Sequence, residues 1–187
     1  MHDDRQLVED RIDRVLRERI RPASYPLSVP MDIALWSTPG EPVPVADGLS
    51  AKYAPARVGD RWGPPWSTTW LRLTCTVPAD WAGREVEALV DLGFDDRMPG
   101  FQCEGLVYRQ DGSAVKGLHP RNCWVRVASP SAGGEDVLLF VEAAANPIIM
   151  GGPPFQPTPL GASETAGTEP LYRIQRVDLA VFDREVW

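Results

Sequence analysis

The stretch Thr68-Thr-Trp-Leu-Arg-Leu-Thr-Cys-Thr-Val77 decides the fold class of this chain. It is dense in β-branched and aromatic residues, and a turn signal follows it at Pro78-Ala-Asp80. Residues of this kind fit the pleated, half-buried surface of a sheet. The stretch therefore predicts a β-strand over residues 68–77.

Similar runs follow toward the C-terminus, each bounded by turn residues. They cover Glu85–Leu92, Gly105–Tyr108, Ala114–Gly117, Cys123–Val127, Asp136–Glu142 and Leu171–Phe182. The turn Gln110-Asp-Gly112 predicts a hairpin, and a phase change in the last run indicates a bulge. Because no helical pattern separates these runs, the sequence predicts a mainly β protein, an antiparallel β-sandwich or jelly roll.

Only the N-terminal region indicates a helix. Between Asp4 and Arg21, apolar residues recur at spacings of one, three and four residues. They are Leu7, Val8, Ile12, Val15, Leu16 and Ile20. Asp3 or Asp4 can cap the start of this helix, and Pro22 is expected to stop it. We interpret it as a helix that packs across a larger body, rather than one that binds a partner.

Nine prolines interrupt the chain between Pro22 and Pro65. Proline disfavours long helices and central strands, so Met31–Trp36 is expected to pair at a sheet edge. The segment is expected to wrap the surface, held by burial of Trp36, Trp62 and Trp66. We predict one compact unit with two parts: a helix and Pro-rich wrapping segment over residues 1–60, and a β-sandwich over residues 61–187.

The composition argues against several classes of function. Lys and Arg number 19 against 26 Asp and Glu, and the net charge of −7 gives no positive field for nucleic acid. No apolar stretch approaches the roughly 20 residues of a membrane span, and the charged N-terminus resembles no signal peptide. The three cysteines lack CxxC spacing and fit reduced thiols, which favours the cytoplasm.

Familiar catalytic and metal-binding signatures are missing from the sequence. Its two histidines, His2 and His119, cannot form a His-rich zinc site, and no HExxH or zinc-finger spacing occurs. The sequence therefore predicts neither a catalytic residue nor a metal ligand in this chain.

One acidic cluster needs separate consideration, because retaining glycoside hydrolysis requires two carboxyl groups about 5 Å apart. Its members are Asp91, Asp95, Asp96 and Glu104. We interpret them as turn caps and as salt-bridge partners of Arg97 and Arg121, rather than as a catalytic pair. A structural Ca²⁺ at Asp95 and Asp96 is left open.

The order of strands and turns resembles the galactose-binding-like jelly roll that many multidomain glycoside hydrolases carry before the catalytic domain. Five motifs, in order, are similar to the N-terminal region of family 38 α-mannosidases of the cytosolic or vacuolar type. They are Trp62–Trp70, Pro99–Tyr108, Lys116–Asn122, Glu142–Pro147 and Asp178–Asp183. The resemblance extends from Leu7 to Trp187.

The resemblance implies a role without catalysis for this chain. In that family a zinc ion held by His and Asp ligands grips the sugar and an Asp attacks it, and this machinery lies in an α/β domain further along the polypeptide. No position here matches those motifs. The chain is expected to be a non-catalytic accessory domain that packs on and supports its own downstream catalytic domain. Zinc is expected in that domain, and hydrolysis of terminal α-mannosyl residues is expected of the full-length enzyme.

Two loops carry candidate contacts to carbohydrate or to the neighbouring domain. Aromatic faces stack on pyranose rings, and planar polar side chains hydrogen-bond to hydroxyl groups. Beside Phe101, the candidates are Gln102, Glu104, His119, Arg121, Asn122 and Trp124. For Trp124 and the tryptophans of residues 62–70 we favour burial in the core, and for His119 a hydrogen bond within its loop.

A third loop, Asn146-Pro-Ile-Ile-Met-Gly-Gly-Pro-Pro-Phe155, has an apolar tip in a Gly/Pro frame. Its candidate interdomain residues are Asn146, Ile148, Ile149, Met150 and Phe155. An apolar tip on an ordered loop is typical of a contact surface. We expect it to dock, together with residues 157–170, on the catalytic domain or on another subunit.

The last residues, Asp183-Arg-Glu-Val-Trp187, resemble a helix N-cap and first turn, so we expect the fragment to end where a linker helix begins. The alternative function is a free-standing carbohydrate-binding module for a mannose-containing glycan. Whether the parent enzyme is a homo-oligomer is left open by the sequence.

Overall fold

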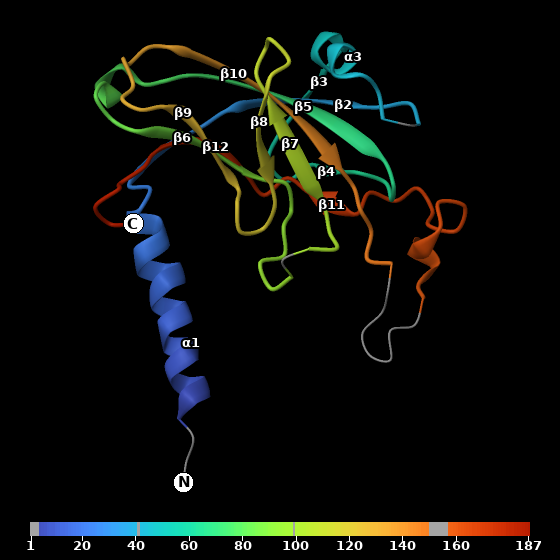
Figure 1. Cartoon of the computed structure of the whole chain (residues 1–187), viewed down its shortest axis with the longest axis horizontal. Helices are drawn as coiled ribbons and strands as arrows, with labels where there is room; N and C mark the ends of the chain where they lie inside the picture. Colours follow the sequence, from blue (N-terminus) through green and yellow to red (C-terminus); the bar gives the residue numbers. More distant parts are fainter. Residues whose placement is uncertain (1–3, 41, 99, 150–156) are drawn as a thin grey trace.

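Residues 4–40, 42–98, 100–149 and 157–187 are described by the computed structural model, in which two antiparallel sheets face each other (Figure 1). The first sheet contains, in order, β1 (Leu27–Pro30), β12 (Arg176–Val181), β6 (Val86–Asp91) and β9 (Trp124–Ala128). The second contains, in order, β3 (Ala54–Ala56), β2 (Asp32–Ser37), β5 (Thr68–Thr76), β10 (Asp136–Ala144), β7 (Glu104–Tyr108) and β8 (Ala114–Leu118). The predicted mainly β, antiparallel sandwich is confirmed.

The central pair β5 and β10 shows how the sequence builds the core. The two strands pair over their whole length, from Asp136 opposite Thr76 to Ala144 opposite Thr68. Leu71 and Leu73 of β5 point between the sheets and are fully buried, because alternate residues of a strand face the same side. The predicted strand is therefore present, from Thr68 to Thr76.

A second, smaller cluster lies on the outer face of the six-stranded sheet. The short helix α3 (Val45–Ser50) covers Trp70, which stacks on Tyr108 with ring centroids 5.5 Å apart. Gly48 is the point of closest approach, because a Cβ there would overlap the Trp70 indole. Trp70 is fully buried, as expected, but outside the space between the sheets.

The edge prediction for Met31–Trp36 is wrong. Strand β2 pairs along all six of its residues with β5 and lies second in its sheet. The edge position belongs to the three-residue β3, which contains Pro55. Proline is tolerated there because the outer side of an edge strand needs no N–H donor. The strand that contains proline is therefore at the edge, and β2 lies inside the sheet.

The final run of alternating residues forms two strands instead of one bulged strand. β11 (Tyr172–Arg173) pairs with β4 (Arg61–Trp62) in a separate two-stranded sheet, and β12 joins the first sheet. Trp62 is buried, and its Nε1 donates a hydrogen bond to the Leu92 carbonyl across 2.7 Å.

The predicted hairpin after β7 is confirmed, with Gly112 at φ +82° in its turn.

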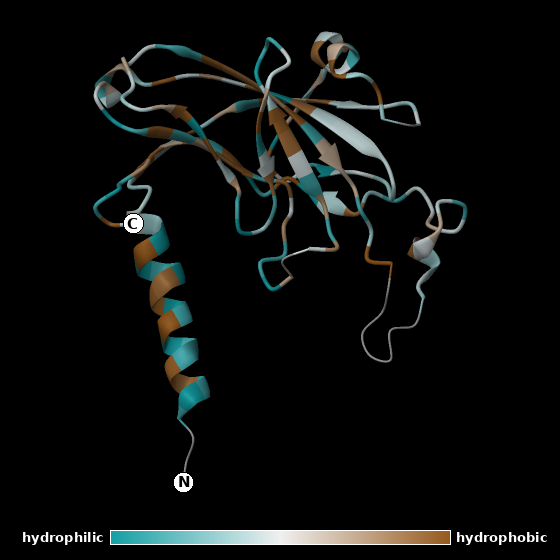
Figure 2. Ribbon diagram, in the orientation of Figure 1, coloured by the Kyte–Doolittle hydropathy of each residue, from teal (hydrophilic) through white to brown (hydrophobic). Residues whose placement is uncertain are grey.

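The N-terminal helix forms, but its predicted packing across the body is wrong. α1 (Arg5–Val15) continues through a π-helical stretch (Leu16–Ile20) into α2 (Arg21–Ala23), one residue beyond Pro22. It extends away from the sandwich, and apolar residues recur along it (Figures 1 and 2). Their side chains are exposed. No described residue of these helical segments is buried, whereas Ser24, which follows them, is buried, and the Tyr25 hydroxyl donates to Glu87 of β6.

The C-terminal residues form the predicted capped turn. The Asp183 carboxylate accepts hydrogen bonds from the backbone N–H groups of Glu185 and Val186, at 3.0 and 3.2 Å. The Asp183 N–H donates to the Ser24 carbonyl, so this turn lies beside the end of the N-terminal helix (Figure 1).

In the described residues, no helix is both long enough and apolar enough to cross a membrane.

Candidate functional site

The loop between β6 and β7 is organised by Gln102, one of the predicted contact residues. Its side-chain oxygen accepts from the Asp95 N–H across 2.8 Å, and its amide nitrogen donates to the carbonyls of Asp95, at 3.0 Å, and Met98. Both ends of the buried amide are therefore occupied within the loop. Gln102 shapes the site and has little capacity left for a ligand.

The acidic cluster is divided among separate structural roles. Asp91 accepts hydrogen bonds from the backbone of Gly93 and Phe94, each at 2.9 Å. Asp95 binds the guanidinium group of Arg97 through both carboxylate oxygens, which lowers the pKa of Asp95. The expected turn caps and salt bridges are present at these two residues.

Glu104 and Asn146 meet where the neighbouring strands β7 and β10 respectively begin and end. The Asn146 Nδ2 donates to the Glu104 carboxylate across 3.1 Å, and more weakly to the Gln102 carbonyl at 3.4 Å. The Asn146 backbone carbonyl also accepts a hydrogen bond from the Tyr172 hydroxyl. Asn146 is therefore held through both its side chain and its backbone. The structure thus brings together one candidate from each of two predicted loops.

These two residues line a groove of about 300 Å³. The groove gathers segments far apart in the sequence, and its lining residues are Trp66, Gly100, Phe101, Gln102, Cys103, Glu104, His119, Pro120, Asn146, Pro147 and Ile149. The predicted residues Gln102, Glu104, His119, Asn146 and Ile149 therefore belong to one site.

Arg121, Asn122 and Trp124 do not line this groove. Asn122 closes the turn after β8 by donating from Nδ2 to the Gly117 carbonyl across 2.8 Å. Trp124 is half-buried, with the Lys116 ammonium group 2.8 Å from its ring centroid. Both side chains stabilise the turn and the adjoining strands, so the structure separates them from the other candidates.

His119 has the loop role that we favoured, and it also lines the groove. Its Nδ1 accepts a hydrogen bond from the Arg121 N–H at 3.4 Å. An imidazole that accepts at Nδ1 carries its proton on Nε2 when neutral. His119 can therefore offer a hydrogen-bond donor at the groove.

The loop that carries the candidate interdomain residues is partly described. Ile148 is 45% exposed, and Ile149 is half-buried in the wall of the groove. Thr158 holds both residues, since its N–H donates to the Ile149 carbonyl and its hydroxyl to the Ile148 carbonyl. The candidates Met150 and Phe155 lie outside the described residues. The exposed Ile148 retains the character expected of a contact surface.

Sequence reasoning missed Trp66, which was expected in the core. The residue is 44% exposed, and its indole N–H donates to the Leu160 carbonyl across 3.0 Å. Its backbone φ is +65°, a left-handed conformation that a bulky side chain rarely adopts. The preceding Gly-Pro-Pro signals a turn, but nothing in the sequence indicates that the turn exposes the ring.

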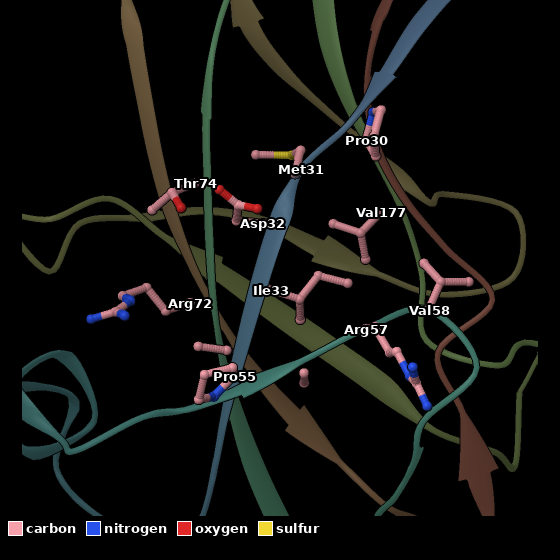
Figure 3. A pocket seen from close by; sticks show the side chains of 12 residues that line it. Pro30, Met31, Asp32, Ile33, Pro55, Arg57, Val58, Arg72, Thr74 and Val177 are labelled. Carbon is pink, nitrogen blue, oxygen red and sulfur yellow. The ribbon is translucent and has the colours of Figure 1, made fainter.

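A second, larger groove of about 650 Å³ surrounds the start of β2. Figure 3 shows Ile33, Val58 and Val177 gathered around it, while the side chains of Arg57 and Arg72 extend to opposite sides of β2. Its lining also includes the polar residues Asp32, Arg57, Arg72 and Thr74, but none of the predicted site residues. We therefore take the groove at Glu104 as the candidate site.

Comparison with known proteins agrees with this fold. Residues 29–180 match the family described as "Alpha-mannosidase, jelly roll domain". The chain belongs to this family. This α-mannosidase jelly roll domain is 32% identical over 177 residues to Alpha-mannosidase 2C1 of Homo sapiens, with 91% of this chain and 15% of that protein aligned. It is 25% identical over 112 residues to Alpha-mannosidase G of Dictyostelium discoideum, with 57% of this chain and 9% of that protein aligned.

These relatives confirm the resemblance to family 38 α-mannosidases. The chain spans less than a sixth of the length of each α-mannosidase named here. Their activity therefore belongs to proteins that are much longer than this jelly roll domain.

Solved structures support the fold alone. A β-glucuronidase from Ruminococcus gnavus in complex with D-glucuronic acid superposes with a TM-score of 0.53 at 10% sequence identity. The match covers 84% of this chain and 30% of that one. The same enzyme in its apo form gives a TM-score of 0.52. The jelly roll domain thus shares its architecture with part of this β-glucuronidase.

Proposed function

We propose that this chain is a non-catalytic accessory domain of an α-mannosidase, and that it packs on and supports a separate catalytic region. The single observation that carries the proposal is the family match over most of the chain, combined with its small share of the relatives' length. The catalytic region, by this proposal, hydrolyses terminal α-mannosyl residues.

The arrangement of polar side chains in the described residues supports a role without catalysis. Among them, no three His, Cys, Asp or Glu side chains come together in a way that could hold a metal ion. Asp95 is bound to Arg97, and the Glu104 carboxylate accepts from Asn146. The described residues therefore do not fit a zinc site, and the proposal assigns the zinc ion to the catalytic region.

The loop at Ile148 supports a contact with that region. Ile148 is an exposed apolar residue on a loop held at its base by Thr158. An apolar side chain on a fixed loop loses unfavourable contact with water when a partner covers it. Replacing Ile148 and Ile149 with serine in the full-length enzyme should lower its melting temperature, whereas an unchanged enzyme would count against this contact.

We place the protein in the cytoplasm. All three of its cysteines are free thiols, which persist in reducing compartments.

The alternative, a free-standing carbohydrate-binding module, differs in what the gene encodes after Trp187. An α/β region with His-x-Asp metal ligands would support the accessory domain, and an immediate stop codon would support the free-standing module.

A direct test combines this chain with the rest of the enzyme. The catalytic region produced without residues 1–187 should be less stable and less active, and adding the separate jelly roll domain should restore both properties. Full stability and activity of the catalytic region alone would contradict the supporting role.

A further inference from the structure

The groove at Glu104 contains an unusual concentration of backbone strain. Among the described residues, only Trp66 and Phe101 have a positive φ without being glycine, at +65° and +56°. Both line this groove. Left-handed conformations of bulky residues reduce stability, and they cluster where a fold holds side chains for binding. The fold therefore holds both aromatic side chains at this groove in conformations that reduce stability.

Phe101 offers an open aromatic surface. The residue is 80% exposed, which leaves most of its ring in water. Trp66 is 44% exposed, and its indole N–H is already used by Leu160. Contacts of these two side chains with a ligand would therefore be made through the apolar surfaces of their rings.

Polar atoms with unused hydrogen-bonding capacity accompany the rings. In the described part of the chain, only one Glu104 oxygen accepts a hydrogen bond from a protein group, and the Asn146 Oδ1 accepts none. His119 adds an imidazole whose Nδ1 accepts from the Arg121 N–H, while no described residue hydrogen-bonds to its Nε2. The groove thus combines an aromatic surface with a carboxylate, an amide and an imidazole.

We propose that this groove binds a neutral hexopyranose, with the apolar face of the sugar on the Phe101 ring and its hydroxyl groups at Glu104 and Asn146. A pyranose has one face of C–H groups and a rim of hydroxyls that both donate and accept, which matches these chemical groups. A volume of about 300 Å³ is at the lower end for small-molecule sites and suits a single sugar ring.

The charge of the lining residues selects the class of sugar. Among the described residues that line the groove, Glu104 contributes a carboxylate and none is a Lys or Arg. A uronic acid would place its own carboxylate beside Glu104 without a cation to compensate, and like charges at short distance repel. A neutral sugar meets no such penalty. The inference goes beyond the proposed accessory role and gives the alternative, a carbohydrate-binding module, a specific site, because the described residues of this chain form the groove without any other region.

The test is an NMR titration of the whole 187-residue chain with methyl α-D-mannopyranoside. We expect chemical-shift changes centred on Phe101, Glu104 and Asn146, with a dissociation constant on the order of 1 mM. D-glucuronate at the same concentrations should cause no such changes. Absence of any shift at about 50 mM mannoside would overturn the proposal, as would equal binding of glucuronate.

Two variants and one matched control localise the site. Phe101→Ala should weaken mannoside binding by about tenfold or more, because the ring surface is lost. Trp187→Ala removes an equally exposed aromatic residue elsewhere and should leave the affinity unchanged. Glu104→Gln should also weaken binding while the fold is retained, because Glu104 lies on the surface. Unchanged affinity in both groove variants would overturn the proposal, as would tighter binding of choline than of mannoside, which would identify a cation site.

Discussion

The Tyr25 hydroxyl donates a hydrogen bond to Oε2 of Glu87 across 2.7 Å and so joins the end of the N-terminal helix to strand β6. Glu87 is only 1% exposed, and Arg126 Nη2 lies 3.8 Å from its other oxygen. A buried carboxylate needs such partners, because water no longer solvates its charge. This contact holds the segment that follows the helix against the outer face of the first sheet.

Tyr25→Phe should therefore lower the free energy of unfolding by about 1.5–3 kcal/mol, the range for a hydrogen bond to a charged group. Tyr53→Phe is the matched control, since the Tyr53 hydroxyl donates to the neutral Gly48 carbonyl at 2.8 Å. In that variant the free energy of unfolding should fall by about 0.5–1.5 kcal/mol. Urea unfolding near neutral pH measures both, and an equal or smaller loss in Tyr25→Phe would contradict the role of Glu87 as a charged acceptor.

The same carboxylate predicts a pH dependence of stability. Burial raises the pKa of Glu87 above its ordinary value of 4.5, and the Tyr25 hydrogen bond and Arg126 oppose this rise only in part. Between 4.5 and the raised value, the native state binds more protons than the unfolded state, so the free energy of unfolding falls as pH rises.

Glu87→Gln removes this contribution. The stability of the unmodified chain, measured relative to that of Glu87→Gln, should decrease from pH 4.5 upward and then level off above the native pKa. Urea titrations of both chains at a series of pH values give the difference, in which contributions of the carboxylates that do not interact with Glu87 cancel. A difference that is constant or that grows with pH would show that burial does not raise this pKa.

Much of the fold could be predicted from sequence because its signals are local. The composition of Thr68–Thr76 and the Asp111-Gly112 turn each specify a structure within a few residues. The position of β2 could not be predicted in this way, since it depends on which distant strand covers its outer side. The strand that covers it is β3, whose Pro55 pairs with Ala34 from about 20 residues further along the chain.

The candidate site was predictable in part for a related reason. Glu104, His119 and Asn146 could be selected by chemistry, but only the tertiary structure shows that they share a groove and that Arg121 does not line it. Trp66 was missed because φ depends on context, and large aromatic residues rarely adopt positive values. Strained positions of this kind contradict local preferences, so sequence patterns cannot reveal them.

A pair of adjacent glycines provides a test of the turn before β10. Gly133 and Gly134 both have positive φ, at +77° and +85°, but a Cβ at Gly133 would lie 2.6 Å from the Ala79 carbonyl oxygen, whereas Gly134 faces open space. Gly134→Ala should lower the free energy of unfolding by about 1–2 kcal/mol from backbone strain alone. Gly133→Ala should lower it by about 1–3 kcal/mol more, because backbone atoms must move. Equal thermal shifts of the two variants would contradict the described packing of this turn.

Thiol reactivity tests the burial of Cys103. Burial raises the pKa of this thiol to about 12, so near pH 8 only about one molecule in ten thousand carries the reactive thiolate. Iodoacetamide should therefore modify the half-buried Cys75 well before Cys103, and mass spectrometry of peptides measures the two rates. In urea the two rates should become similar. Faster modification of Cys103 in the native protein would show that this part of the core is open.

The most direct test of the account is the release of 4-nitrophenol from 4-nitrophenyl α-D-mannopyranoside by the purified 187-residue chain, with and without added Zn²⁺. An accessory jelly roll domain that leaves catalysis to another region should give no rate above that of buffer in either condition. Turnover proportional to the concentration of the chain would contradict the account.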